Sequence, residues 1–262
     1  MAEDHRFFIG NQTAFCAPVA DPFAFAVTHH FDAFEFFPDG RWSARDASAD
    51  ERAGFCAIAA ERKIRLSVHA SLESRLVDRG TWGRLMHDID LAHDLGAQVL
   101  NLHLASGDPV GCARAALSLV EILQPLGITL ALENTVSLGP QEVNEIFARL
   151  SDLATGQQAN VGLCLDMGHA NLCAATHNDY LRFFDALGDH VPIVHVHIHE
   201  NWGDADRHLT LFTGPARRDP SGVIGLLQRL RQRRFRGSLI LEQWPTPASL
   251  LLLAYERLRA IQ

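Results

Sequence analysis

The chain has 262 residues, 47% of them hydrophobic, and a formal net charge of −8 at neutral pH. This composition supports a full hydrophobic core and excludes a disordered chain, and the acidic balance disfavours nucleic-acid binding. The longest apolar run, residues 250–253, is too short to cross a membrane, and the first residues do not resemble a signal peptide. Five cysteines without a Cys-x-x-Cys pair indicate reduced thiols, so we expect a cytoplasmic protein without a membrane partner.

Eight short apolar or alternating segments recur along the chain, with enough residues between them for helices. In chain order these predicted strands are Phe7–Gly10, Ala33–Phe36, Ile64–His69, Val99–His103, Thr129–Glu133, Val161–Asp166, Val194–His199 and Ser238–Glu242. Ser48 and Glu51 form a capping box at the start of one helix, and Gly96 is a plausible stop after another that begins near Trp82. Further helices are predicted at residues 110–127, 140–150, 179–187, 221–236 and 247–261.

Eight strands that alternate with helices predict a closed parallel (β/α)8 or TIM barrel, an α/β fold formed by residues 1–262 as a single domain. The competing architecture, a doubly wound open sheet, usually carries a glycine-rich phosphate loop after its first strand. Residues 10–13, Gly-Asn-Gln-Thr, are not such a loop. Barrel enzymes place their sites at the carboxyl ends of the strands, so we expect the site at the C-terminal face.

The third to the eighth predicted strands each end in a side chain that can ligate a metal. They end in His69, His103, Glu133, Asp166, the row His195, His197 and His199, and Glu242. Within these strands the candidates share a face with small or polar residues, while leucines and other large aliphatic residues occupy the opposite face. Because the outer face of a barrel packs against helices, the candidates are predicted to point inward.

The richest stretch is residues 194–209, with four histidines and three carboxylates. A solvated edge strand would explain the alternation, but a divalent metal suits several imidazoles together with carboxylates better. Two loops add His169, Asp206 and His208. The predicted metal ligands are thus His69, His103, Glu133, Asp166, His169, His197, Asp206, His208 and Glu242. One ion cannot use them all, so we expect two or three ions, and the nitrogen and oxygen donors favour zinc or manganese.

These motifs together resemble the xylose isomerase-like TIM barrel superfamily, which includes endonuclease IV and many sugar isomerases and epimerases. The motifs are Leu-Ser-Val-His69-Ala, Asn-Leu-His103, Leu-Glu133-Asn134, Leu-Asp166-Met-Gly-His169, His197-Ile-His199-Glu-Asn201, Asp206-Arg-His208 and Leu-Glu242, from the third predicted strand to the end. The resemblance implies a central metal held by Glu133, Asp166, His197 and Glu242. Its endonuclease-like members imply that His69 and His103 serve a second zinc ion, and His169, Asp206 and His208 a third. His197 is preferred to its neighbours because the family's ligand lies three residues before the acidic residue found here as Glu200.

One function that this resemblance implies is a metal-dependent isomerase or epimerase of sugars or sugar phosphates. The ion would acidify a C–H bond and stabilise an enediolate, while the catalytic residues Glu133 and Glu242 pass the proton as base and acid. The partner would be a small carbohydrate, and the acidic net charge agrees with an uncharged one. The predicted substrate contacts are Asn134, His199, Asn201 and Trp202.

The alternative is a zinc-dependent phosphodiester hydrolase of the endonuclease IV (AP endonuclease) type. The full ligand set favours it, whereas the net charge and the segments 10–15 and 37–42, which lack that enzyme's motifs, make DNA the less favoured partner. The basic run at 229–236 precedes the last strand and is interpreted as a solvated helix end at the opposite face. A barrel that binds metal without catalysis remains a third possibility. A Schiff-base aldolase is excluded because Lys63, the only lysine, precedes the third strand. The oligomeric state stays open.

Overall fold

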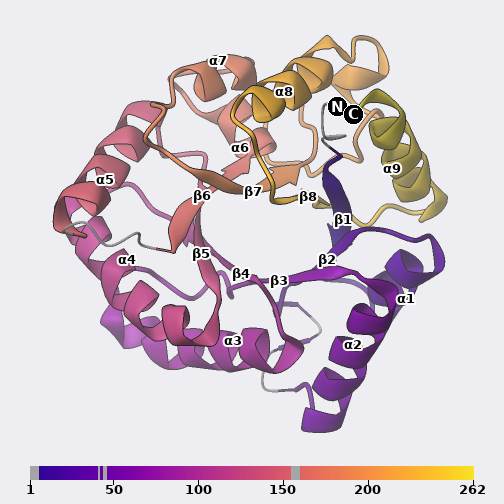
Figure 1. The fold of residues 1–262 in the computed structure, drawn as a ribbon. Coiled ribbons are helices and arrows are strands. Elements are labelled where there is room, and N and C mark those ends of the chain that lie inside the picture. Colours follow the sequence, from indigo (N-terminus) through magenta and orange to yellow (C-terminus); the bar gives the residue numbers. More distant parts are fainter. Residues whose placement is uncertain (1–5, 41, 44–45, 155–159) are drawn as a thin grey trace, which may run out of the picture.

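The computed structural model describes residues 6–40, 42–43, 46–154 and 160–262. Within them, eight parallel strands form a closed barrel in which each strand pairs with its neighbours in sequence and β8 pairs with β1. The strands surround the centre of the view in Figure 1, and the helices form a ring outside them. The predicted (β/α)8 barrel is thereby confirmed.

The strands are β1 (Phe8–Gln12), β2 (Ala33–Phe36), β3 (Arg65–His69), β4 (Val99–Leu104), β5 (Thr129–Asn134), β6 (Val161–Asp166), β7 (Ile193–Ile198) and β8 (Ser238–Leu241). The α-helices are α1 (Ala20–Thr28), α2 (Ala49–Arg62), α3 (Trp82–Leu95), α4 (Pro109–Leu123), α5 (Pro140–Leu153), α6 (Met167–Leu172), α7 (Tyr180–Asp185), α8 (Ser221–Gln232) and α9 (Ser249–Ile261). Short 3-10 helices are η1 (Arg79–Thr81), η2 (Gln124–Leu126) and η3 (Pro215–Arg217). Among the described helices, none has the length and apolar character needed to cross a bilayer.

All eight predicted strands are present, but two helices were not expected. Helix α1 precedes β2 and buries Phe23 and Ala26. Helix α6 begins directly after β6, because the Asp166 carboxylate caps it by accepting a hydrogen bond from the backbone N–H of His169 at 2.5 Å. Helix α8 ends earlier than predicted, and Arg234 adopts a positive φ of 55° in the turn that follows.

The two faces of the strands differ as the alternation predicts. Leu100, Leu102 and Leu104 of β4 are fully buried in the hydrophobic core, as expected for the face that packs against the helices. The intervening residues of β4 point into the barrel, and the parallel register pairs His103 of β4 with Glu133 of β5. Side chains from successive strands therefore reach the same level inside the barrel, which is what brings distant residues into one site.

The basic run at the end of α8 is engaged within the protein. Arg229 forms two hydrogen bonds of 2.6 and 2.7 Å to the carboxylate of Asp185, and Arg233 donates to backbone carbonyls that include that of Gly188. The run lies before β8, at the amino-terminal end of the barrel, as predicted. Its described contacts give no indication of a nucleic-acid surface.

Candidate metal centre

The first group of predicted ligands converges on Glu133. Nε2 of His103 lies 3.1 Å from Oε1 of Glu133, and Nε2 of His69 lies 3.3 Å from Oε2. Asn101, two residues before His103 on the same face of β4, donates a hydrogen bond from its side-chain amide to Glu133. The neighbouring strands β3, β4 and β5 thus deliver three predicted ligands to one point.

His197 lies between this group and two further carboxylates. Its Nδ1 is 3.2 Å from Oε2 of Glu133, 3.4 Å from Oε2 of Glu242 and 3.8 Å from Oδ2 of Asp166. His197 and the three carboxylates are all buried. The four residues to which the resemblance assigns a central metal thus lie together, and Nδ1 is the imidazole nitrogen that faces these three carboxylates.

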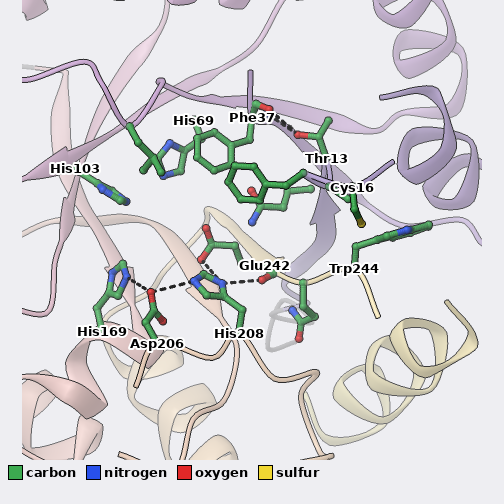
Figure 2. Close-up of a pocket in the computed structure, with 15 residues that line it drawn as sticks. Thr13, Cys16, Phe37, His69, His103, His169, Asp206, His208, Glu242 and Trp244 are labelled. Carbon is green, nitrogen blue, oxygen red and sulfur yellow. Dashed lines mark hydrogen bonds and ion pairs between the residues drawn. The ribbon is translucent and has the colours of Figure 1, made fainter. Parts of the chain in front are cut away.

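The third group lies closer to solvent, on helix α6 and on the loop that follows β7. Oδ2 of Asp206 is 3.2 Å from Nε2 of His169 and 3.1 Å from Nε2 of His208. Figure 2 shows these three side chains side by side, with His69 and His103 across the opening from His208. All the predicted ligands therefore lie in one continuous cluster at the carboxyl ends of the strands.

The junction between β6 and α6 is fixed by contacts that the sequence does not reveal. The Asn134 side chain accepts a hydrogen bond from the Asp166 backbone N–H at 2.9 Å and donates one to its carbonyl at 3.0 Å. Gly168 allows a close approach to His199, because a Cβ at this position would lie 2.0 Å from that imidazole. Asn134 and Gly168 therefore hold the shape of the junction that carries Asp166 and His169.

The charges in the cluster shift the pKa values of its members. Burial alone would raise the pKa of Glu133, but the positive charges of His103 and His197 outweigh it and hold that pKa well below its usual range. Burial alone would lower the pKa of His208, but Asp206 and Glu242 raise it to about 9. Without a metal, protonated imidazoles therefore balance the carboxylates. A bound metal must displace these protons, so metal affinity is expected to decrease at low pH.

The donor atoms fit a divalent metal ion. Several buried polar atoms find no hydrogen-bond partner among the described residues, including Nε2 of His69, Oε1 of Glu133, Nδ1 of His197 and Oε2 of Glu242. A buried polar atom without a partner costs about 1–3 kcal/mol. Groups of imidazole and carboxylate donors lie within 4.8 Å of one another, and a divalent cation would satisfy them. The identity and number of the ions stay predictions.

One buried acid of the cluster is not among the predicted ligands. Glu35 of β2 is fully buried, with Nε2 of His195 at 2.9 Å and Nε2 of His197 at 2.8 Å from its carboxylate. His195 is thus a core histidine whose partner is Glu35. The sequence signal that was missed is the acidic Glu35 between Phe34 and Phe36 inside a strand. A charge at such a position can be buried only if a partner inside the barrel compensates it.

A cavity of about 410 Å³ opens above the cluster. Its lining includes His69, His103, His169, Asp206, His208 and Glu242 on one side. The other side is largely apolar and is formed by loops that follow β1, β2, β3 and β8. It includes Phe15, Phe37, Leu72 and Trp244, and Figure 2 shows Phe37 and Trp244 at this side of the opening. Glu242 faces the cavity, whereas Glu133 does not line it.

The predicted substrate contacts lie outside this cavity. His199, Asn201 and Trp202 line a second cavity of about 410 Å³, between the loop after β7 and the start of α8. The side chain of Asn201 is engaged with the backbone carbonyl of Gly168 at 2.9 Å. Asn134 is fully buried and lines neither of the two cavities. The structure therefore brings together the predicted metal ligands. His199 lies beside them, with its Nε2 3.1 Å from Oδ2 of Asp166, whereas Asn201 and Trp202 lie at the second cavity.

Known proteins resemble this chain both in sequence and in fold. A model of the family described as xylose isomerase-like TIM barrel matches residues 23–260. A probable endonuclease 4 of Halobacterium salinarum is 28% identical over 121 residues, which are 42% of this chain and 44% of that protein. The chain spans less than half the length of the curated relatives that it matches.

Two solved structures illustrate the range of similar folds. A D-tagatose 3-epimerase-like protein has a TM-score of 0.75 at 20% identity, and the match covers 97% of this chain and 96% of that one. Endonuclease IV from Thermus thermophilus has a TM-score of 0.66 at 22% identity, with 97% and 99% covered. At these identities the likeness shows a shared fold, and proteins of both predicted functions have it.

Proposed function

The chain belongs to the xylose isomerase-like TIM barrel family, and from this premise we propose that it is a metal-dependent isomerase of a small, unphosphorylated sugar or related hydroxy carbonyl compound. The observation that carries the choice of substrate is the lining of the cavity above the metal cluster. Among the described residues that line it there is no arginine or lysine. Away from the metal cluster, a phosphate group is usually held by such cations or by backbone N–H groups, so the lining that lacks these side chains suits an uncharged substrate.

The size and the walls of the cavity agree with this substrate class. A volume of about 410 Å³ lies within the range of about 300–1,000 Å³ that is typical of small-molecule sites. Phe37 and Trp244 offer apolar surface for the C–H face of a sugar, and Gln12 and Gln243 add amides that can bond to hydroxyl groups. The net charge of −8 likewise disfavours a polyanion.

The two predicted catalytic glutamates differ in access to the cavity, which affects the proposed proton transfer. Glu133 is enclosed by His69, His103 and His197, so its carboxylate acts as a metal ligand in our proposal. Glu242 lines the cavity and acts as the base. A single base can move a proton between adjacent carbons when removal and return occur on the same face, as aldose–ketose isomerisation allows. We therefore propose isomerisation rather than epimerisation, which requires proton delivery to the opposite face.

The other residues of the site hold the reacting groups in place. A divalent ion at the cluster supplies an electrophile that acidifies the C–H bond next to the substrate carbonyl. His69, His103 and Asp206 fix the positions of the carboxylates and imidazoles through the contacts described above.

Phosphodiester hydrolysis is the second candidate, and one observation favours it. The group formed by His169, Asp206 and His208 is complete, with contacts of 3.2 and 3.1 Å, although an isomerase needs only the central group. In a hydrolase, several ions would steady the phosphoryl oxygens and the leaving group. The cavity lining and net charge are the observations against it.

Deuterium exchange tests the proposed reaction. Protein loaded with Mn²⁺ or Zn²⁺ is incubated in D2O with a panel of unphosphorylated aldoses and ketoses, and ¹H NMR follows C–H exchange and product formation. We expect exchange and interconversion of an aldose with its ketose, abolished in Glu242→Gln. Cleavage of duplex DNA with an abasic site, without exchange in any sugar, would instead establish the hydrolase. Exchange with inversion at a single carbon would establish an epimerase.

A further inference from the structure

A buried carboxylate lies one layer deeper in the barrel than the predicted metal ligands. Glu35 on β2 lies beside Ser67 on β3 in the parallel ladder, and the Ser67 hydroxyl donates a hydrogen bond of 2.9 Å to its Oε2. Nε2 of His195 lies 2.9 Å from the same oxygen. Nε2 of His197 lies 2.8 Å from the other oxygen, Oε1, as an ion pair without an aligned hydrogen bond. Three side chains from two strands thus surround one carboxylate.

The contact between Glu35 and His197 determines which imidazole nitrogen keeps its proton when a metal binds. An ionised carboxylate offers only acceptors, so a nitrogen that faces one is protonated while no ion is present. Nε2 of His197 faces Glu35, whereas Nδ1 faces Glu133 at 3.2 Å and Glu242 at 3.4 Å. An ion among Glu133 and Glu242 would displace the proton on Nδ1, whereas Glu35 would keep the proton on Nε2, so Nδ1 is the nitrogen available to the ion.

We propose that Glu35 is a positioning residue of the metal centre, which holds His197 in the orientation and tautomer that direct Nδ1 toward the central ion. Ser67 and His195 fix the carboxylate in turn. Histidines that ligate metals usually donate their second N–H to such a partner, and removal of that partner typically lowers metal affinity by about 10–100-fold. This inference depends on the metal centre proposed above, but not on the reaction it performs.

A second ion among Glu35, His195 and His197 is the competing interpretation, because these residues also form a compact donor group. The contacts of 2.8 and 2.9 Å are those of direct charge-assisted interactions between nitrogen and oxygen. Ligands of one tetrahedral zinc, with bonds of about 2.0–2.1 Å, would lie roughly 3.3 Å apart. The observed distances therefore favour direct contact, in which Glu35 acts on the metal through His197.

Metal affinity in Glu35→Gln tests the proposal. The amide keeps the size of the side chain but presents one oxygen and one N–H₂, so it cannot accept protons from both histidines. Competition with a chromophoric chelator for Zn²⁺ is expected to show affinity about 10–100-fold weaker at one class of site. The visible absorption spectrum of the Co²⁺-loaded protein is expected to change as well, because it reports the ligands and their geometry. Unchanged affinity and spectrum would overturn the proposal.

Two further variants separate positioning from folding. Glu200→Gln is a matched control, because Glu200 is also buried but accepts hydrogen bonds from the backbone N–H groups of Gly214 and Ala216. We expect it to keep wild-type affinity, and an equal loss there would contradict a specific role for Glu35. If Glu35→Gln does not fold, Zn²⁺ affinity is measured in Glu35→Asp instead. Aspartate keeps the negative charge, but its shorter side chain cannot contact His197 as glutamate does. Wild-type affinity in that variant would overturn the proposal, whereas absence of Zn²⁺ binding in wild-type protein would overturn the metal centre itself.

Discussion

Neighbouring residues on the barrel strands serve opposite purposes on the two faces of the sheet. Leu132 and Glu133 are adjacent in β5, and both are fully buried. Leu132 belongs to the hydrophobic core, where burial stabilises the fold. Glu133 belongs to the polar cluster, where burial is tolerated because His103 and His197 supply opposite charge. Burial therefore stabilises the fold on the outer face of the strand, whereas on the inner face it prepares a binding site. Substitutions of buried and cavity-lining residues test this contrast.

The largest effect is expected for Glu133→Gln on the inner face. Loss of the charge that contacts His69, His103 and His197 is expected to remove bound metal. Without that electrophile the rate of the reaction is expected to fall by about 10²–10⁴-fold. Metal content by mass spectrometry and the rate of C–H exchange measure the two effects. Glu145→Gln, at an exposed position on α5, is the control and should change neither. Full metal content in Glu133→Gln would contradict the role of this residue as a ligand.

Leu132→Ala tests the outer face of the same strand. Truncation of a fully buried leucine leaves a cavity, and we expect the free energy of unfolding to fall by about 2–5 kcal/mol. Urea denaturation of the metal-free protein measures this change. The folded variant should bind Zn²⁺ with wild-type affinity, because the side chain points away from the cluster. A loss of affinity comparable to that of Glu133→Gln would show that the two faces are not independent.

A third substitution compares the cluster with a buried carboxyl group that lacks such histidine partners. Asp88 on α3 accepts hydrogen bonds from the backbone N–H of Ser71 at 3.1 Å and the hydroxyl of Ser74 at 3.2 Å. Burial raises the pKa of Asp88 to about 6, although these two hydrogen bonds lower it, whereas the pKa of Glu133 is held low. The two buried acids thus shift in opposite directions, because several histidines contact Glu133 directly, whereas the weaker influence of His69 on Asp88 does not offset burial.

The raised pKa has a defined consequence for stability. The folded state holds the proton of Asp88 more tightly than the unfolded state, so this group's contribution to stability is lost as pH rises from about 4 to about 6. Asp88→Asn removes that titration. Between pH 4.5 and 7, we expect wild-type protein to lose roughly 2 kcal/mol relative to the variant. Urea denaturation at both pH values measures the difference, and a difference independent of pH would contradict the assignment.

The smallest effect is expected for the tryptophans that line the two cavities. Their substitution shows which cavity binds the substrate. Trp244 lines the cavity above the cluster, so Trp244→Ala is expected to raise KM by roughly tenfold, with less change in kcat. Trp202, which is 53% exposed, lines the second cavity, and Trp202→Ala is expected to leave KM unchanged. Steady-state kinetics on the substrate found by exchange compares the two variants. A higher KM in Trp202→Ala alone would restore the original prediction that this residue contacts substrate.

Much of the cluster was predictable because a barrel imposes a simple geometry. Period-two alternation places His103 and Glu133 on the inner face, and parallel pairing brings the strand ends to one rim. The positions of side chains in the loops were harder to predict. Asn201 and Trp202 follow β7 closely in sequence, but the loop directs them to the second cavity. Loop direction depends on contacts such as that between Gly168 and His199, which no local pattern encodes.

Local periodicity and the closure of a barrel were enough to predict the order of strands and helices, the inward face of each strand and a set of candidate metal ligands. Which atoms meet became visible in the packed barrel. It placed Glu35 beneath His197, enclosed Glu133 among histidines and left Glu242 open to the cavity. The physical reason is that contacts between residues far apart in the chain depend on strand register and side-chain direction, which are set when the whole barrel packs.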